Sequence, residues 1–458
     1  MKNNSRKSKQ NPSQQRPKYA QESFSGGIMT SFGGAGLWRR FLDKLKMPQR
    51  LCQIQFQWAG RKFSAASYLM ALLVGQLLGS QRQSEVTQLR DDPGALLALG
   101  LETVPSQSAL SRFLASCDEA LAEQLLALNR QLVQKLRCKL GSATIDLDGQ
   151  IVSTRGEPEG ANFGYNPKRR GCKSYFVLMG FLGEVRDVLT AHLYPGSEQT
   201  VSAEMAIAAY QQSRRALGPR TKRLRLRADS AFFSDAFFCE LEQDKVSYFV
   251  VAVMSPPLKC QIAGLEYREL DDKWAIGELQ YQARSWKRPR RMVVIRKRLE
   301  PDHKQARQPT LFECDRYAYQ VIVTNTDWKP QAVWHFYNHR CCCENMIKEG
   351  QSDFGTDHIL SHTYGGNATW LGLAVLAYNI ANWFRDKILG QKEHRKMTKW
   401  LWFDKLTTLS NAEGRRTLIN IPARLVHSGR RYFLRMWSKH PSRELYEGAL
   451  RAVGDFSL

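Results

Sequence analysis

Three acidic residues in this sequence stand where they could work together in metal-assisted chemistry. Asp148 lies in an alternating segment that predicts a strand, and Asp146, two residues earlier, projects to the same face. Asp229 ends another predicted strand, where a carboxylate is held rigidly at the edge of a sheet. Glu344 lies in a predicted helix. Three such carboxylates suit a pair of Mg²⁺ ions, with Mn²⁺ as a substitute, that assist attack on a phosphodiester.

The helix that carries Glu344 is predicted to begin near Lys329 and to continue through Gly355. At about 100° per residue, one continuous helix places several functional side chains on a single stripe. The stripe consists of Tyr337, Arg340, Cys341, Glu344, Lys348 and Gln351. A hydroxyl, a guanidinium and an ammonium group then surround the carboxylate, which suits a metal-bound phosphodiester. The alternative is a surface helix with i,i+4 ion pairs such as Glu344 with Lys348, each worth roughly 0.2–0.5 kcal/mol.

The charge balance favours a polyanionic partner. The 458 residues include 67 Lys and Arg against 43 Asp and Glu, for a net charge of +24. Because phosphates can neutralise such an excess, we expect nucleic acid first and an anionic membrane surface second. The longest apolar run, residues 68–79, contains Gln76 and is too short to span a membrane, so no membrane-spanning helix is predicted.

The amino-terminal segment and the cysteines predict a cytoplasmic protein. The first residues are basic but lack the apolar stretch of a secretory signal. The ten cysteines are then expected to be reduced thiols. No Cys-x2-Cys pair occurs, and the adjacent residues Cys341 to Cys343 cannot provide tetrahedral zinc geometry. A structural zinc site is therefore not expected.

The first third of the chain is predicted to be a tail followed by helices. Residues 1–36 are polar and then glycine-rich, which predicts a disordered basic tail. Residues 37–140 show helical spacing of apolar residues and predict a helical DNA-binding domain. Within it, Ser106 or Ser108 caps a short predicted helix that carries Arg112. This pattern fits the recognition helix of a helix-turn-helix, with Arg112 on DNA; a plain helical bundle is the alternative.

The apolar periodicity changes from helical to alternating at Ala143. Three strands, a helix, a strand, a helix and a strand follow in the order of a ribonuclease H-like domain, an α/β fold with a mixed sheet. We assign residues 141–258 and 329–390 to this domain and residues 259–328 to a β-rich insertion domain. The remainder, residues 391–458, is predicted to be a basic C-terminal region.

The most basic stretch lies within the β-rich segment. Between Arg284 and Arg307 there are ten Lys or Arg against two acidic residues. One interpretation is a DNA-contacting arm in which Arg288, Arg290 and Arg291 meet phosphates without reading bases. The other is a solvated loop, which is the usual fate of a charge run.

These motifs resemble those of the DDE transposases of bacterial insertion sequences that carry a β-rich insertion. The resemblance rests on DLDG around Asp148, on RADSAFF around Asp229, and on a Tyr-x2-Arg-x3-Glu signature formed by Tyr337, Arg340 and Glu344. It extends over most of the chain and includes AYNIANWFR after the signature and IPARLVHSGRR near the end.

The resemblance implies a metal-binding triad of Asp148, Asp229 and Glu344, with Tyr337 and Arg340 on phosphates near the cleaved end. It implies an enzyme that binds the terminal inverted repeats of its element, cleaves the DNA by metal-dependent hydrolysis and joins the 3′ ends to target DNA. The partner is double-stranded DNA, and at least a homodimer is expected on it. The expected location is the bacterial cytosol, at the nucleoid.

Two positions depart from the family pattern. The family has Lys seven residues after the Glu, where this chain has Gln351, and often Thr two residues after the first Asp, where this chain has Gln150. Lys348, one turn after Glu344, is expected to take over the phosphate contact. The competing hypothesis is a transposase-derived, non-catalytic DNA-binding repressor, against which the three intact acids argue.

Overall fold

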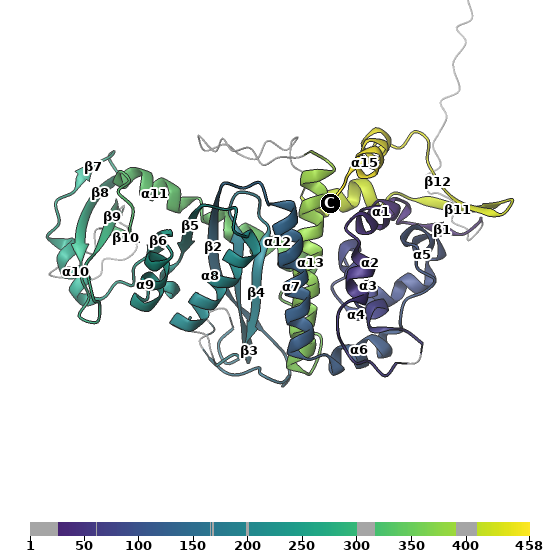
Figure 1. Ribbon diagram of the computed structural model, residues 1–458, viewed down its shortest axis with the longest axis horizontal. Helices are drawn as coiled ribbons and strands as arrows, with labels where there is room; N and C mark the ends of the chain where they lie inside the picture. Colours follow the sequence, from purple (N-terminus) through teal and green to yellow (C-terminus); the bar gives the residue numbers. More distant parts are fainter. Residues whose placement is uncertain are drawn as a thin grey trace, which may run out of the picture.

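The computed structural model describes residues 26–60, 62–164, 166, 169–197, 201–299, 317–390 and 410–458. Within these residues, nine strands form one mixed sheet in the order β4-β3-β2-β5-β6-β10-β9-β8-β7. Figure 1 shows this sheet in the middle and at one end of the molecule, with a helical region at the other end. None of the helices in the described ranges is long and apolar enough to cross a membrane.

The ribonuclease H-like part of the sheet has the predicted elements in the predicted order. They are β2 (Ser142–Ser153), β3 (Ser174–Leu182), β4 (Val188–Tyr194), α8 (Ala203–Leu217), β5 (Arg223–Ala228), α9 (Asp235–Gln243) and β6 (Ser247–Val251). Strands β2, β3 and β4 form an antiparallel meander, and β5 and β6 run parallel to β2. Strand β3 is apolar and buried along its whole length, as expected for a central strand covered on both faces. The predicted fold class is confirmed.

The β-rich segment has its predicted strands, but they extend the same sheet. It contains α10 (Pro256–Ala263), β7 (Arg268–Glu269), β8 (Trp274–Tyr281), β9 (Arg290–Arg298) and β10 (Tyr317–Thr324). Strand β10 pairs antiparallel with β6, with Val323 opposite Val250. This pairing satisfies the backbone groups along that edge of β6, so the β-rich segment predicted as an insertion domain continues the ribonuclease H-like sheet.

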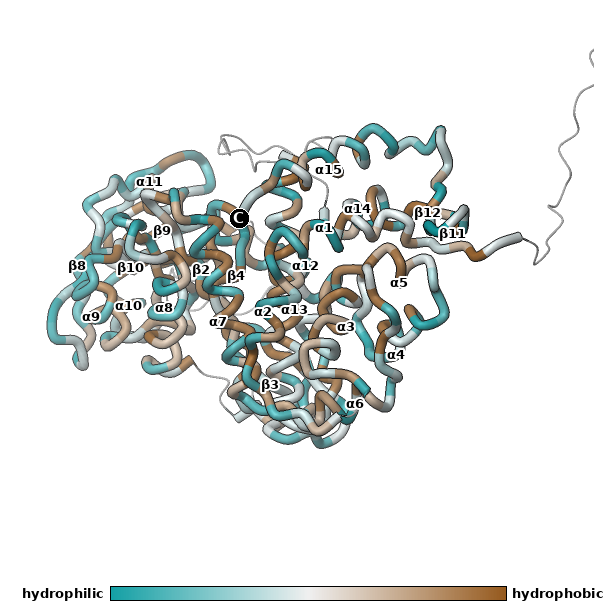
Figure 2. The backbone as a smooth tube through the Cα atoms, turned by 45° about the vertical axis from the view of Figure 1, so that its right-hand side comes forward, coloured by the Kyte–Doolittle hydropathy of each residue, from teal (hydrophilic) through white to brown (hydrophobic). Residues whose placement is uncertain are grey.

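The helical region precedes the sheet in sequence and packs against it through the buried helix α13. Its helices are α1 (Gly36–Lys44), α2 (Met47–Cys52), α3 (Ala65–Leu78), α4 (Gln83–Gln88), α5 (Pro93–Leu99), α6 (Gln107–Ser116) and α7 (Glu119–Leu136). Helix α13 (Tyr364–Lys387) contacts α3, α6 and α7 as well as β4. Figure 2 shows α13 in the middle of the molecule, beside α7 and α3.

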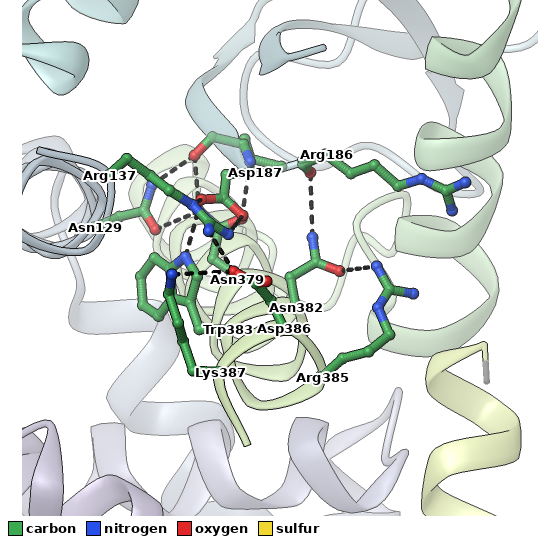
Figure 3. A network of polar contacts seen from close by, with 11 residues as sticks. Asn129, Arg137, Arg186, Asp187, Asn379, Asn382, Trp383, Arg385, Asp386 and Lys387 are labelled. Carbon is green, nitrogen blue, oxygen red and sulfur yellow. Dashed lines mark hydrogen bonds and ion pairs between the residues drawn. The ribbon is translucent and has the colours of Figure 1, made fainter. Parts of the chain in front are cut away.

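A buried polar network joins α7 and α13 to the start of β4. Asn379 receives the backbone N–H of Val188 (2.8 Å) and donates to the Val188 carbonyl (2.7 Å) and to Asn129 (2.7 Å). Arg137 forms a buried ion pair with Asp187, 2.7 Å from Nε to Oδ2. Figure 3 shows these side chains converging from the two helices on the strand. The sequence pattern assigns α7 to the DNA-binding domain, but in the structure this helix packs against the nine-stranded sheet through β4 and α8.

The predicted long helix is two helices, α11 (Pro330–Asn338) and α12 (Cys341–Phe354). At the break, the N–H groups of Arg340, Cys342 and Cys343 donate to carbonyls three residues earlier, at 2.8, 3.3 and 2.8 Å. This tighter turn changes the angle between side chains before and after it. The single stripe predicted from Tyr337 to Gln351 is therefore wrong, because it assumed an unbroken helix.

The C-terminal part returns to the helical region and pairs with the start of the described chain. It comprises α14 (Asn411–Gly414), a π-helical turn (Arg415–Ile419), β11 (Ala423–Ser428), β12 (Arg431–Met436) and α15 (Arg443–Asp455). Strand β1 (Met29–Thr30) pairs with β11, so the end of the predicted disordered tail, residues 29–36, is ordered, and residues 1–25 of that tail lie outside the described residues. Gly33 and Gly34 allow this approach: the Gly33 N–H donates to the Ile421 carbonyl (2.9 Å), and a Cβ on Gly33 would lie only 2.6 Å from that oxygen.

Replacing Gly34 tests how tightly the two ends of the chain are packed. A Cβ at this position would lie 1.8 Å from the Leu418 carbonyl oxygen, so backbone would have to move. Gly34→Ala should therefore lower the free energy of unfolding by about 1–3 kcal/mol, measured by urea denaturation. Gly448→Ala is the matched control: its Cβ meets nothing within 4 Å, and it should be neutral or gain up to about 1 kcal/mol. Equal stability of the two variants would contradict the close packing.

Candidate active site

The parallel pairing of β2 with β5 brings the first two acids together. Leu147 lies opposite Ala228 in this ladder, so the next residues, Asp148 and Asp229, follow side by side. Asp148 is only 8% exposed, whereas the Asp229 side chain is 40% exposed. Asp148 is therefore held within strand β2, and Asp229 lies part-exposed just after the carboxyl end of β5.

Arg340 lies between the two carboxylates. Its Nη2 is 2.9 Å from Asp148 Oδ1 and 3.7 Å from Asp229 Oδ2, and it donates to the Leu147 carbonyl at 3.1 Å. The residue itself is buried at the junction of α11 and α12. A single guanidinium nitrogen thus serves as the counter-cation of both acids.

Burial controls the protonation of the groups around Arg340. Burial raises the pKa of Asp148, the charge of Arg340 opposes that rise, and the neighbouring Asp229 adds to it. Burial also raises the pKa of Tyr337 to about 12, although the charge of Arg340 works against it. The Tyr337 hydroxyl is therefore a neutral hydrogen-bond donor at physiological pH, held beside two carboxylates and their cation.

Glu344 is on α12, one turn after Arg340, and its side chain is exposed. Among the described residues, neither Glu344 nor Lys348 has an ion-pair partner within 4.0 Å, so the i,i+4 pair of the alternative interpretation is not formed. In the same part of the chain, no three His, Cys, Asp or Glu side chains lie close enough to hold a metal ion. The structure therefore unites two of the three predicted ligands and leaves the third on the neighbouring helix.

The donor set of Asp148 and Asp229 fits a hard divalent cation. Both are carboxylates, which Mg²⁺ and Mn²⁺ prefer, and both already face one shared positive charge from Arg340. A cation that binds here would need further oxygen ligands, and Glu344 is the nearest acid along α12.

Asp146 is a structural residue, and its partner Arg227 was missed from the sequence. The two lie directly opposite in the β2–β5 ladder and form a buried bidentate ion pair at 2.6 and 2.7 Å. Arg227 also donates to the Phe336 carbonyl of α11 at 2.8 Å. Arg225 and Arg227 alternate with apolar residues before Asp229, and this pattern could have indicated the ion pair. The same pattern is equally typical of a strand with one solvent-exposed face.

Gln150 and Gln351, the two residues that depart from the family pattern, are hydrogen-bonded to each other. Gln351 Nε2 donates to Gln150 Oε1 at 2.6 Å, which ties α12 to β2 one turn beyond the exposed Lys348. An amide pair thus occupies the two positions at which related sequences have Lys and often Thr. No sequence rule predicts this contact, because the two residues are 201 positions apart.

The three arginines of the predicted basic arm form ion pairs with acids of the protein itself. Arg290 is buried and pairs with Glu242 at 2.9 Å and with Asp235 at 2.6 Å. Arg291 pairs with Glu278 at 2.6 Å and donates to two carbonyls, those of Thr326 and Trp328. Arg288 also pairs with Glu242, but it is half exposed. These contacts correct the prediction of phosphate binding for Arg290 and Arg291. The end of the stretch, residues 300–307, lies outside the described residues.

Arg112 is exposed on α6, far along the chain from the acids. Ser106 caps this helix as predicted, accepting the Ala109 N–H at 3.3 Å. Arg112 borders a surface cavity of about 670 Å³ that Lys62 and Arg90 also line. The structure therefore keeps Arg112 accessible and places two more cations beside it.

Comparison with known proteins adds a family match. A family model described as Transposase DDE domain group 1 matches residues 13–457. No curated protein matches the chain.

Solved structures resemble the chain more weakly. A piggyBac transposase synaptic complex with hairpin DNA is 11% identical with a TM-score of 0.46, over 81% of this chain and 80% of that one. A Mos1 transposase paired-end complex with left transposon end is 16% identical with a TM-score of 0.17, over 43% and 62%. A Mos1 mariner paired-end complex with Mn is 15% identical with a TM-score of 0.17, over 46% and 65%. All three TM-scores lie below 0.5, so the family match alone identifies the chain.

The ion pair beneath the site gives a stability prediction. Asp146→Ala would leave Arg227 buried without its partner, so it should lower the free energy of unfolding by about 3–5 kcal/mol. Asp229→Ala removes a part-exposed carboxylate whose local contact is the Ala231 N–H, and should cost at most about 2 kcal/mol. Urea denaturation of both variants measures the difference. Equal losses of stability would mean that the Asp146–Arg227 pair does not stabilise the ladder.

Proposed function

Because the chain belongs to the Transposase DDE domain group 1 family, we propose that it is the transposase of an insertion sequence. It binds the terminal inverted repeats of its element, cleaves the DNA by metal-dependent hydrolysis and joins the 3′ ends to target DNA in a cut-and-paste reaction. The observation that carries this proposal is the pair of carboxylates, Asp148 and Asp229, that the strand register sets side by side with Arg340.

Asp148, Asp229 and Glu344 would hold the metal ions, Mg²⁺ or Mn²⁺. When bound, these ions would activate the attacking oxygen and stabilise the leaving oxygen. Asp148 supplies a carboxylate fixed by the sheet, and Asp229 supplies one that is open to solvent. Water is the nucleophile for cleavage, and the freed 3′ hydroxyl is the nucleophile for joining.

The groups around the acids would position the scissile phosphate. Arg340 directs its guanidinium at both carboxylates, so a phosphate bound beside them faces the same cation. Tyr337 offers a neutral hydroxyl, because its pKa is raised to about 12 by burial. Lys348 lies one turn after Glu344, and its exposed ammonium group has no ion-pair partner among the described residues. Arg112 and Arg288 would bind DNA phosphates elsewhere on the protein.

The reaction also requires that both ends of the element be held together, so we propose at least a homodimer on double-stranded DNA. The helical region, residues 37–140, and the basic residues 391–458 would contribute to DNA binding outside the catalytic site. Such a protein would act in the bacterial cytosol, at the nucleoid.

Asp229→Ala separates catalysis from binding. It removes a metal ligand but no positive charge, so Mg²⁺-dependent nicking of DNA with the element ends should be abolished while the gel-shift affinity stays nearly unchanged. Glu119→Ala, an exposed acid on α7, is the control and should nick normally. Persistent nicking by Asp229→Ala would contradict the assignment. Intact wild-type binding without any nicking would favour a non-catalytic repressor.

Lys348→Ala tests whether Lys348 makes the phosphate contact that the family lysine makes at the position of Gln351. The loss of an ammonium near the scissile phosphate should lower the cleavage rate at least tenfold, or about 1.4 kcal/mol of transition-state stabilisation. Single-turnover rates at saturating DNA and Mg²⁺ measure this effect. Lys259→Ala, which removes an exposed lysine on α10, controls for charge and should cleave normally. Normal cleavage by Lys348→Ala would remove Lys348 from the site.

A further inference from the structure

The small sheet of β1, β11 and β12 concentrates exposed apolar side chains. Ten large apolar side chains are exposed in the described part of the chain, and five belong to this sheet or its flanks: Ile28, Met29, Tyr432, Phe433 and Trp437. Figures 1 and 2 show the β11–β12 hairpin projecting from the body, at the end opposite β7–β10. Such a cluster on a projecting element indicates a contact surface.

The strand register collects arginines on one face of this sheet. Arg424 lies opposite Arg435, Val426 opposite Phe433, and Ser428 opposite Arg431, while Met29 of β1 lies opposite Arg424. Residues that pair across strands, and those two apart along a strand, share a face. We call this set the arginine face: Met29, Arg424, Val426, Ser428, Arg431, Phe433 and Arg435. All of its members are exposed except Val426, which is half-buried.

The opposite face packs against the protein at its base, while His427 and Tyr432 at its tip are exposed. Thr30 and Ala423 are buried on that side, and Thr30 Oγ1 donates to Asp92 Oδ2 at 2.7 Å. The close approach of Gly34 to the Leu418 carbonyl holds the base of the sheet. The arginine face is therefore presented outward from a packed base.

The charge on the arginine face has no acidic counterpart among the residues that the structure describes. Residues 421–443 contain six Lys or Arg and no Asp or Glu. Among the described residues, none of Arg424, Arg431 and Arg435 has an ion-pair partner within 4.0 Å. Arg424 and Arg435 lie directly opposite, and like charges in that arrangement repel. A bound polyanion would relieve this repulsion.

We propose that the arginine face binds the phosphate backbone of duplex DNA outside the catalytic site, an inference that rests on the proposed transposase function. The three arginines bind phosphates on either side of Phe433, which packs against the sugars between them. A two-stranded ribbon of six-residue strands is about 20 Å long and fits the major groove of B-DNA. A second copy of the chain is a poor occupant, because a two-fold interface would oppose the same positive face to itself.

The salt dependence of DNA binding by the full-length protein tests this proposal. The hairpin variant carries Arg424→Gln, Arg431→Gln and Arg435→Gln. The control variant removes the same charge by Arg215→Gln, Arg220→Gln and Lys222→Gln. These are exposed residues near the start of β5, at the end of the strand away from Asp229. Fluorescence anisotropy with a labelled duplex of about 40 base pairs gives the slope of log K against log salt. The hairpin variant should lower this slope by up to about 0.9 for each phosphate that it no longer neutralises, and the control should not.

A crosslinking measurement locates the DNA-binding surface independently. A photoreactive p-benzoylphenylalanine in place of Phe433 should crosslink to the duplex, whereas the same residue in place of Arg215, which is exposed on α8 in the control surface, should not. Equal slopes for wild type and hairpin variant, or equal decreases in both variants, would overturn the proposal. So would a hairpin variant that is defective only in self-association, measured by light scattering, or only in binding to anionic vesicles. Hairpin-dependent binding by a wild type that never nicks DNA would instead overturn the proposed function alone.

Discussion

The parallel pairing of β2 with β5 is the constraint on which the candidate site depends. The two strands are far apart in sequence, and their register is fixed by Asp146 and Arg227, which lie opposite each other in a buried ion pair. A slip of one residue would turn the side chains of a strand to the other face and separate Asp148 from Asp229. The same guanidinium reaches the Phe336 carbonyl, so the ion pair also sets the end of α11 against the sheet. An interaction that takes no part in the proposed chemistry therefore positions the residues that do.

Arg340 depends on this arrangement and on the break between α11 and α12. In an unbroken helix its direction relative to Tyr337 would differ, and the turn of i−3 hydrogen bonds is what directs it toward Leu147 and Asp148. Its contacts stabilise two adjacent carboxylates that would otherwise repel each other. The Gln150–Gln351 bond holds α12 to the same strand further along. The site is thus tied to the sheet on both sides of Glu344, whose own side chain remains free to bind a ligand.

The arginines of this chain fall into two groups that composition does not separate. Arg137, Arg227, Arg290 and Arg340 are buried and paired with carboxylates, and they hold helices and strands together. The arginines of the β11–β12 hairpin are exposed and face no carboxylate among the described residues. The net charge of +24 already subtracts every acid, so it gives the excess of cations but not where on the protein they lie.

The sequence by itself determined the order of the elements, and it predicted which acids would form the site. Alternating and helical periodicities are local, because they reflect which face of each segment is buried, and they predicted the meander, α8, α9 and the ribonuclease H-like order. The signature residues Asp148, Asp229 and Glu344 were likewise predicted from the residues next to them in the sequence.

Only the tertiary structure decided which charges are paired and which are free. The continuation of the sheet from β6 into β10, the break at Arg340, the Gln150–Gln351 bond and the burial of Arg290 all depend on segments distant in sequence. A basic stretch has the same sequence pattern whether its partners are phosphates in solution or the acids of another helix. Local patterns carry no information about that choice, because the strength of a charge interaction is set by burial and by the three-dimensional neighbours.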